Sequence, residues 1–316
     1  MTEVVLAVDI GGTKTAVGLA DRDDALLDVA TAPTPASDGP EAVVRTILDL
    51  AALLLGRSDD IAVRGVGIGT AGVVDVNTGS IVSSTDTMSG WAGTPLAALV
   101  RSALGTRLEP SAVVHVQNDV DAHALGEMRH GAAVGARSAL VVAVGTGVGA
   151  GIIVEGRALR GARHVAGEIG HVPTPGAEHL RCPCGRRGHL EAIGSGVGMH
   201  RHYLSIGGDP AVTDARGIVA RAGAADPLAN RAIEDSAAAV GRAIAAAVTL
   251  LDPERVVVTG GVAQIGEVWW SPMIRAFRSE AIDALQHVPV LPGLLGADAP
   301  LLGAAASAWD AQEGRS

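Results

Sequence analysis

Short apolar runs alternate with helical patterns along the chain. Five runs rich in Val, Ile and Ala each end in glycine or a polar residue, the pattern of buried strands whose carboxyl ends carry loops. These runs are residues 4–9, 63–69, 111–119, 139–145 and 255–261. Apolar residues at helical spacing, with Gly and Pro at the expected ends, predict helices between them. The predicted helices are 41–56, 94–105, 227–251 and 303–312. Alternating strands and helices predict an α/β protein.

The same plan occurs twice, at residues 4–20 and 140–156. Each copy has an apolar strand, a loop rich in Gly with Thr, and a second alternating run that reads as another strand. A dinucleotide-binding unit would continue from the glycine turn into a helix, and the sequence contains no G-x-x-x-x-G-K-[ST] motif. A glycine turn between two strands can still bind phosphate through its exposed N–H groups. The repeat therefore predicts two hairpins that bind one nucleotide.

The first loop reads DIGGTKT. Gly11 and Gly12 let the backbone approach a phosphate, Thr13 offers a hydroxyl and Lys14 a cation. Asp9, at the end of the strand, is placed to hold Mg²⁺ through water, because Mg²⁺ usually keeps several waters. The alternative is a plain hairpin turn.

The second loop contains Gly145, Thr146 and Gly147, and taken alone it is equally typical of a structural hairpin. The third is the pair Gly260 and Gly261 after the strand VVVT, which leaves room for a flat purine. On its own that pair is an ordinary strand-to-helix turn. Together the three loops predict a nucleotide site.

Asp119 ends the strand SAVVHVQND. Transfer of a phosphoryl group to an alcohol needs positioning, charge neutralisation and a carboxylate that takes the hydroxyl proton. Asp119 suits that last role. It equally suits a helix N-cap, and Asp121 competes for both interpretations.

Both cysteines of the chain, Cys182 and Cys184, lie between His171 and His189. The four side chains supply the soft and borderline ligands of a tetrahedral, structural zinc site. The alternatives are unligated thiols and surface histidines. Substitute histidine ligands nearby are His164 and His179.

Glu168 and Glu191 flank the four candidate ligands. Fixing the loop with a metal would also fix these two carboxylates, as outer groups and ligands orient one another around a metal. Either could instead be an ordinary surface charge.

Length and composition limit the possible classes of protein. A chain of 316 residues predicts two domains or one split by an insertion, and 48% apolar residues predict a folded, soluble protein. A formal charge of −10 disfavours nucleic acid as a partner. The start MTEVVLAVDIGG does not resemble an export signal, and glycines interrupt the uncharged run 138–154, so we expect a cytoplasmic protein without a membrane span.

These motifs occur in an order that resembles the ROK family of sugar kinases, repressors and open reading frames. The matching motifs are DIGGTKT, GTAGVVD, QND, VGTGVGAG, GEIGH, C-x-C-G-x-x-G-x-x-E and VVVTGG. The resemblance implies the actin-like ATPase (ribonuclease H-like) duplicated fold, with two α/β domains around a cleft and ATP and sugar between them. The implied domains are residues 1–118 with the C-terminal helix 303–316, and residues 119–302 with the zinc loop 167–196 and a dimerisation surface. A homodimer or homotetramer is implied.

The resemblance also implies roles for individual residues. Asp119 would be the catalytic base. The implied sugar-binding residues are Gly72 in the loop 69–72, Asn118, Asp119, Glu168, His171 and Glu191. The implied ATP-binding residues are Asp9, Gly11, Gly12, Thr13, Lys14, Gly145, Thr146, Gly147, Gly260 and Gly261. The implied zinc ligands are His171, Cys182 and Cys184.

This sequence departs from the family pattern at two places. His189 stands where the family usually has a third cysteine. With His189 as the fourth ligand, we expect a Cys₂His₂ zinc site rather than Cys₃His. The stretch SSTDTMSGW has Ser84, Thr85, Asp86 and Thr87 ahead of Trp91 and lacks the Asn that often precedes the Trp, which leaves the identity of the sugar open.

The implied activity is an ATP- and Mg²⁺-dependent hexokinase acting on a 6-hydroxyl, with glucose as the first choice and N-acetylmannosamine or N-acetylglucosamine next. Polyphosphate is a second candidate donor. The alternatives are a sugar-sensing repressor, for which the sequence before Asp9 offers no helix-turn-helix, and a non-catalytic sugar-binding protein.

Overall fold

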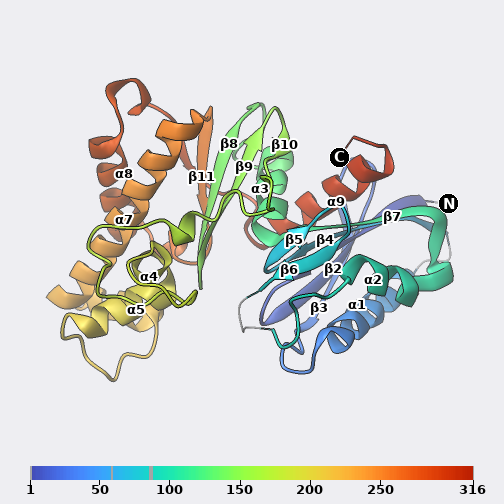
Figure 1. The fold of residues 1–316 in the computed structure, drawn as a ribbon, viewed down its shortest axis with the longest axis horizontal. Coiled ribbons are helices and arrows are strands. Elements are labelled where there is room, and N and C mark those ends of the chain that lie inside the picture. Colours follow the sequence, from blue (N-terminus) through green and yellow to red (C-terminus); the bar gives the residue numbers. More distant parts are fainter. Residues whose placement is uncertain (1, 58–59, 85–87, 316) are drawn as a thin grey trace. The chain divides into compact units, whose positions relative to one another are not determined.

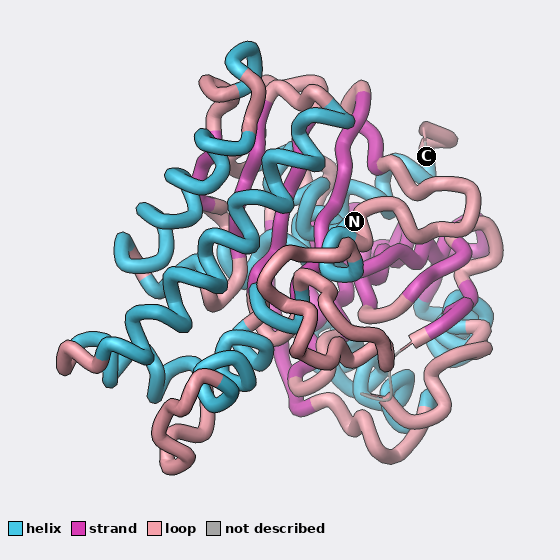
Figure 2. The backbone as a smooth tube through the Cα atoms, turned by 60° about the vertical axis from the view of Figure 1, so that its left-hand side comes forward, coloured by secondary structure: helices cyan, strands magenta, loops and turns pink. Residues whose placement is uncertain are grey.

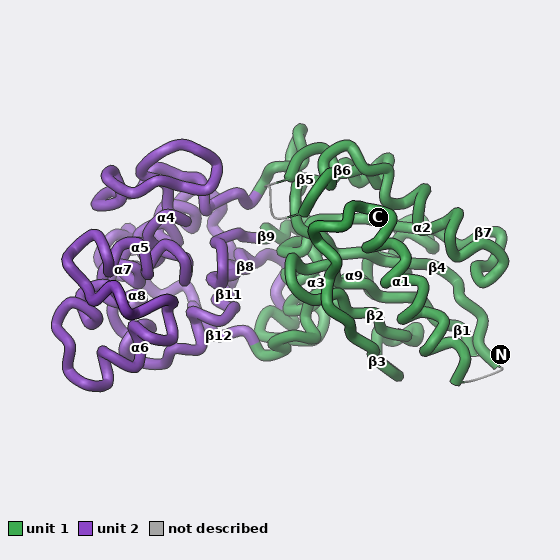
Figure 3. The backbone as a smooth tube through the Cα atoms, turned by 90° about the horizontal axis from the view of Figure 1, so that it is seen from below, with its two compact units in different colours: residues 1–135, 151–166, 294–316 green, residues 136–150, 167–293 purple. Residues whose placement is uncertain are grey.

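The computed structural model describes residues 2–57, 60–84 and 88–315. The chain forms two compact units, coloured separately in Figure 3. Unit 1 comprises residues 1–135, 151–166 and 294–316, and unit 2 comprises 136–150 and 167–293. The resemblance implies domain boundaries at 118 and 302, whereas this division groups residues 119–135, 151–166 and 294–302 with unit 1.

Unit 1 is built on a five-stranded sheet with the order β3-β2-β1-β4-β7. Its strands are β1 (Thr2–Ile10), β2 (Lys14–Ala20), β3 (Leu26–Pro33), β4 (Ile61–Thr70) and β7 (Leu108–Asn118). The first three strands are antiparallel neighbours, whereas β4 runs parallel to both β1 and β7. Consequently β1, β4 and β7 end at the same edge of the sheet, where Asp9, Thr70 and Asn118 lie.

Both faces of this sheet are covered, and successive side chains of β1 pack into the two different cores. Val4, Leu6 and Val8 belong to a core cluster with helices α1 (Pro40–Leu55) and α2 (Leu96–Leu104). Val5 and Ala7 point to the other face and pack in a second cluster with α9 (Ala299–Gln312). Successive strand side chains point to opposite faces, so one strand contributes to both cores.

Unit 1 also contains helix α3 (Asp119–His130), which packs against α9, and three short strands. The short strands are β5 (Val73–Asp75), β6 (Ser80–Ser83) and β10 (Arg157–Ala158). Helix α9 begins at Ala299, four residues before the expected start. Pro300 lies in its first turn, where the missing N–H breaks no helical hydrogen bond.

A second sheet has the order β10-β9-β8-β11-β12. Strands β8 (Ala139–Val144), β11 (Arg255–Thr259) and β12 (Val290–Pro292) belong to unit 2, as do the first three residues of β9 (Val148–Val154). β8 and β12 both run parallel to β11. The helices of unit 2 are α4 (Glu191–Gly194), α5 (Gly196–Ser205), α6 (Ala215–Gly223), α7 (Pro227–Leu251) and α8 (Glu267–Glu280). Helices α7 and α8 pack against each other (Figure 1).

The predicted α/β class is confirmed, and the backbone combines helices with strands in both units (Figure 2). Each of the five predicted strands and four predicted helices corresponds to an observed element. Among the described residues, none of the helices combines the length and apolar character needed to cross a lipid bilayer.

Candidate active site

The first predicted phosphate loop is the tight turn between β1 and β2. The turn is closed by the Gly11 N–H, which donates to the Lys14 carbonyl at 3.0 Å. The Thr34 hydroxyl donates to the Gly11 carbonyl at 2.7 Å, which ties the turn to the end of β3. Thr13 and Lys14 are exposed, so their side chains are accessible to a ligand.

Two carboxylates of unit 1 interact at this edge of the sheet. Burial, and secondarily the charge of Asp119, raise the pKa of Asp9 to about 7, while Lys14 acts in the opposite direction. Burial also raises the pKa of Asp119. The pair therefore concentrates negative charge where a cation would stabilise both ionised forms.

The sequence allowed Asp119 to be either a catalytic carboxylate or the N-cap of a helix, and the junction of β7 and α3 distinguishes these two roles. The residue that caps α3 is Asn118, whose Oδ1 accepts the N–H groups of Val120 at 2.8 Å and Asp121 at 3.3 Å. Its amide nitrogen donates to the Gly72 carbonyl at 3.0 Å. Asp119 is the first residue of the helix, so capping rests mainly on its neighbour.

Gly72 is required by the geometry of its own loop. Its φ of +103° is in the region that favours glycine, and a Cβ there would lie 2.7 Å from the Ser83 carbonyl oxygen. The Asn118 contact therefore fixes the loop 69–72 beside the start of α3. The predicted sugar contacts of Gly72 and Asn118 stay predictions.

The second and third glycine loops meet in unit 2. The Val262 N–H donates to the Val144 carbonyl at 2.9 Å, which brings the end of β11 to the start of the loop Gly145–Gly147. Gly260 has a φ of +93°, and a Cβ at this position would lie 2.4 Å from the Val144 oxygen. Only glycine allows this close approach of the two strand ends.

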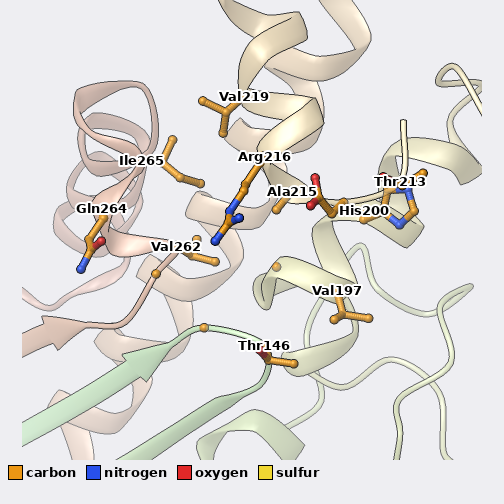
Figure 4. Close-up of a pocket in the computed structure, with 14 residues that line it drawn as sticks. Thr146, Val197, His200, Thr213, Ala215, Arg216, Val219, Val262, Gln264 and Ile265 are labelled. Atoms are coloured by element: carbon orange, nitrogen blue, oxygen red, sulfur yellow. The ribbon is translucent and has the colours of Figure 1, made fainter. Parts of the chain in front are cut away.

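A cavity of about 640 Å³ opens beside these two loops. Gly145, Thr146 and Gly261 line it together with residues of α5, α6 and the turn after β11 (Figure 4). The apolar side chains of the lining are Val197, Ala215, Val219, Val262 and Ile265. Arg216, near the start of α6, points its guanidinium into the cavity (Figure 4).

The helical part of this lining was not predicted. His200, Asp214 and Arg216 come from or flank α5 and α6, which carry no nucleotide motif. The sequence offered no local signal for them, because they reach the cavity only through the packing of unit 2.

The four candidate metal ligands lie together in unit 2. One ligand atom from each of His171, Cys182, Cys184 and His189 lies within 4.8 Å of all the others. Cys182 Sγ is 3.6 Å from His171 Nδ1, and Cys184 Sγ is 3.2 Å from His189 Nδ1. Tetrahedral zinc with ordinary bond lengths sets sulfur and nitrogen about 3.6 Å apart. The donor set and its spacing therefore fit a four-coordinate zinc ion.

Tight turns bring these ligands together. The Cys182 N–H donates to the Arg186 carbonyl at 2.8 Å, and the Gly185 N–H donates back to the Cys182 carbonyl at 3.0 Å. His171 ends a short 3₁₀ turn (Ile169–His171). The possible substitutes point elsewhere, since His164 lies 3.4 Å from Asp75 and His179 lies 3.2 Å from the Ser205 hydroxyl.

The two carboxylates that flank the ligands have different surroundings. Glu168 Oε2 lies 3.6 Å from His171 Nε2, on the side of the imidazole that faces away from Cys182. This separation exceeds a hydrogen-bond distance, so Glu168 lies near the imidazole without yet forming the hydrogen bond by which an outer carboxylate orients a ligating histidine. Glu191 Oε2 instead accepts the Val148 N–H at 3.0 Å, directly after the second glycine loop.

The expected sugar-binding residues are divided between the units. Gly72, Asn118 and Asp119 belong to unit 1, whereas Glu168, His171 and Glu191 belong to unit 2. Thr85 to Thr87, at which the sequence departs from the family pattern, lie outside the described residues.

Comparison with known proteins connects these features to one family. Residues 5–311 match the model of the ROK family. The glucokinase of Halalkalibacterium halodurans is 31% identical over 88% of this chain and 86% of its own length. The N-acetylmannosamine kinase of Citrobacter koseri is 32% identical over 95% of this chain and 97% of its own length.

Solved structures agree with the sequence relatives. The ROK hexokinase of Thermus thermophilus superposes with a TM-score of 0.85 at 33% identity, over 98% of this chain and 99% of that chain. The ROK glucokinase of Streptomyces griseus, solved with glucose and AMPPNP, has a TM-score of 0.77 at 31% identity, over 96% and 98%. The expected duplicated α/β fold of the actin-like ATPases is confirmed. The chain belongs to the ROK family.

Proposed function

We propose that this protein is an ATP- and Mg²⁺-dependent sugar kinase that transfers the γ-phosphoryl group of ATP to the 6-hydroxyl of a hexose, with glucose as the first choice. The observation that carries the proposal is the half-buried Asp119 at the start of α3, coupled electrostatically to Asp9 at the first phosphate loop. The likeness to a glucokinase solved with glucose and AMPPNP supports the same activity.

Asp119 is the proposed catalytic base. As the sugar oxygen bonds to the γ-phosphorus and the bond to ADP breaks, the hydroxyl proton moves to the Asp119 carboxylate. Burial raises the pKa of this group, which makes the ionised form a stronger base. The cap from Asn118, anchored on Gly72, holds the start of α3 and thereby the position of the carboxylate.

The nucleotide is proposed to bind at the glycine loops. Backbone N–H groups at Gly11, Gly12 and the Gly145–Gly147 loop suit phosphate oxygens, and Lys14 supplies a positive charge. The apolar wall formed by Val219, Val262 and Ile265 suits the adenine ring. Asp9 would hold Mg²⁺ through water, and the ion would supply charge neutralisation during transfer.

Zinc is proposed as a structural ion. His171, Cys182, Cys184 and His189 would fill all four positions, so no open position is left for a reacting group. What zinc supplies is the geometry of the segment that carries Glu168 and Glu191.

A second candidate substrate is an N-acetylhexosamine. The observation in its favour is the 32% identity to an N-acetylmannosamine kinase, close to the value for the glucokinase relative. N-acetylglucosamine belongs to the same class. A cytoplasmic location and a homodimeric or homotetrameric assembly are part of the proposal, with no nucleic acid or membrane partner.

The test is ADP release across a panel of glucose, mannose, fructose, N-acetylglucosamine and N-acetylmannosamine, with ATP and then polyphosphate as donor. In Asp119→Asn, kcat is expected to fall by about 10²–10⁴, the usual contribution of a general base, with the Kd of the sugar retained. Asp121→Asn is the matched control, two residues along the same helix, and should keep most of the activity.

Two results would contradict this assignment. If Asp119→Asn retains turnover, Asp119 is not the catalytic base. A protein that binds ATP but releases no ADP with any sugar of the panel would favour a non-catalytic sensor.

A further inference from the structure

The segment that carries the four metal ligands is attached at both ends to the second glycine loop. We call residues 167–196 the metal segment and residues 145–150 the phosphate hairpin. At the start of the segment, the Gly167 carbonyl accepts the Ala150 N–H at 2.9 Å. At its end, the Gly196 N–H donates to the Gly145 carbonyl at 2.8 Å. The metal segment therefore begins and ends on the phosphate hairpin, within unit 2.

Glu191 adds a third, charged attachment. Its Oε2 accepts the Val148 N–H at 3.0 Å, and a hydrogen bond to an ionised acceptor is stronger than a neutral one. The neighbouring Gly147 leaves the necessary space, because a Cβ at that position would lie 2.7 Å from the same oxygen. A carboxylate expected to contact sugar thus already holds the backbone of the hairpin.

The position of Glu191 depends on the metal ligand two residues before it. His189 forms a β-bridge with Pro173, and the buried Leu190 donates its N–H to the Val172 carbonyl at 3.0 Å. His171 ends the turn just before these partners. An ion that joins His171 to His189 would therefore clamp both sides of the short stretch from which Glu191 reaches the hairpin.

We infer that Glu191 is a positioning residue of the phosphate hairpin, and that metal bound by the four ligands raises nucleotide affinity through it. This inference rests on the proposed function, in which the hairpin binds ATP phosphates. The physical basis is preorganisation: a hairpin already fixed by the metal segment loses less conformational freedom when phosphate binds. Coupling between two ligands is reciprocal, so nucleotide must raise metal affinity by the same factor.

The test measures binding of Mg·ADP to the full chain by calorimetry, without sugar, so that a sugar role of Glu191 does not enter. The protein is compared zinc-loaded, after removal of zinc by a chelator and desalting, and after reloading. Removal is expected to weaken ADP binding by at least about fivefold, the lower end of typical couplings between sites, and reloading should restore it. Zinc affinity, measured by competition with a colorimetric chelator, should fall by the same factor when ADP is left out.

Three variants separate positioning from general stability. Zinc-loaded Glu191→Ala should bind ADP as weakly as the zinc-free protein and should no longer respond to zinc. Glu191→Gln keeps an oxygen that can accept the Val148 N–H and should retain most of the affinity. The matched control Glu178→Ala removes an exposed carboxylate of the same segment, which accepts only within its own turn, and should behave as the wild type.

The outcomes also distinguish this inference from the proposed function. Equal ADP affinity with and without zinc, in protein that keeps its circular dichroism spectrum, would overturn the inference alone. If the zinc-free protein unfolds, an unchanged ADP affinity in zinc-loaded Glu191→Ala would overturn it. Zinc-loaded wild type that binds no ADP would refute the proposed function and this inference with it.

Discussion

Replacing Asp9 with asparagine should stabilise the folded protein above neutral pH. Burial and the charge of Asp119 raise the pKa of Asp9 from 3.8 to about 7, so ionising this group in the folded state is unfavourable. An acid whose folded pKa lies above its unfolded value adds no penalty below the unfolded pKa. The penalty grows as pH rises through the window between about 4 and 7 and is complete above it.

The magnitude follows from the size of the shift. A change of about 3 pKa units at 1.36 kcal/mol per unit gives an upper limit of about 4 kcal/mol at pH 8.5. Because Asp9 is only half-buried and the Asn amide must also find partners, we expect Asp9→Asn to gain about 2 kcal/mol. The gain should shrink as pH falls from 7 toward 4.

The assay is urea unfolding of wild type and Asp9→Asn between pH 4.5 and 8.5, without nucleotide or Mg²⁺. Asp28→Asn is the control of opposite sign, because a hydrogen bond from Arg57 lowers the pKa of the partly exposed Asp28. The reasoning would be refuted if the difference in unfolding free energy between Asp9→Asn and wild type did not change with pH. It would also be refuted if the wild type were more stable than Asp9→Asn at pH 8.5. The stabilised variant should bind Mg·ADP poorly, which is the expected cost of a residue kept for function.

Three further predictions test other parts of the site. Binding of Mg·ADP near pH 7 should release a proton from Asp9, because a nearby cation favours the ionised carboxylate; calorimetry in two buffers of different ionisation enthalpy measures this, and zero proton release contradicts it. Gly260→Ala should weaken ADP binding and lower Tm, since its Cβ would meet the Val144 oxygen at 2.4 Å, whereas Gly261→Ala, with nothing within 4 Å, should lower Tm little. Loss of an outer-shell partner typically lowers metal affinity by about 10- to 100-fold, and His189→Ala, which removes a direct ligand, should lower zinc affinity by more. His189→Cys should retain tight zinc binding. Equal zinc affinity in His189→Ala and wild type would exclude His189 as a ligand.

Much of the candidate site was predictable because its signals are local. The strand pattern placed Asp9 and Asn118 each near the end of a buried strand, and because β1, β4 and β7 run parallel in the structure, these ends meet at one edge of the sheet. The two cysteines and two histidines likewise lie within a stretch short enough for turns to gather them. The Gly pair after β11 was expected only to leave room for a purine, and the structure adds that Gly260 allows the close approach to Val144.

The parts that were not predictable depend on contacts between distant segments. Arg216 reaches the cavity because α6 packs beside the two glycine loops, and no pattern in α6 itself indicates a ligand. The cap of α3 was also open: the sequence allowed Asp119 or Asp121 for it, whereas in the structure Asn118 caps the helix and leaves the Asp119 carboxylate for chemistry.

Glu191 shows how such a contact changes the interpretation of a motif. In the sequence, the two cysteines are interpreted as metal ligands that fix carboxylates for sugar binding. No sequence motif connects the cysteines to the nucleotide. In the structure the Glu191 carboxylate accepts the Val148 N–H of the phosphate hairpin, while the ends of the metal segment bond to the same hairpin. A carboxylate has two oxygens and several acceptor sites, so the Val148 bond leaves Oε1 for a sugar hydroxyl. One structural ion would then organise groups for both substrates of the proposed reaction, which explains why the chain places both of its cysteines in this one segment.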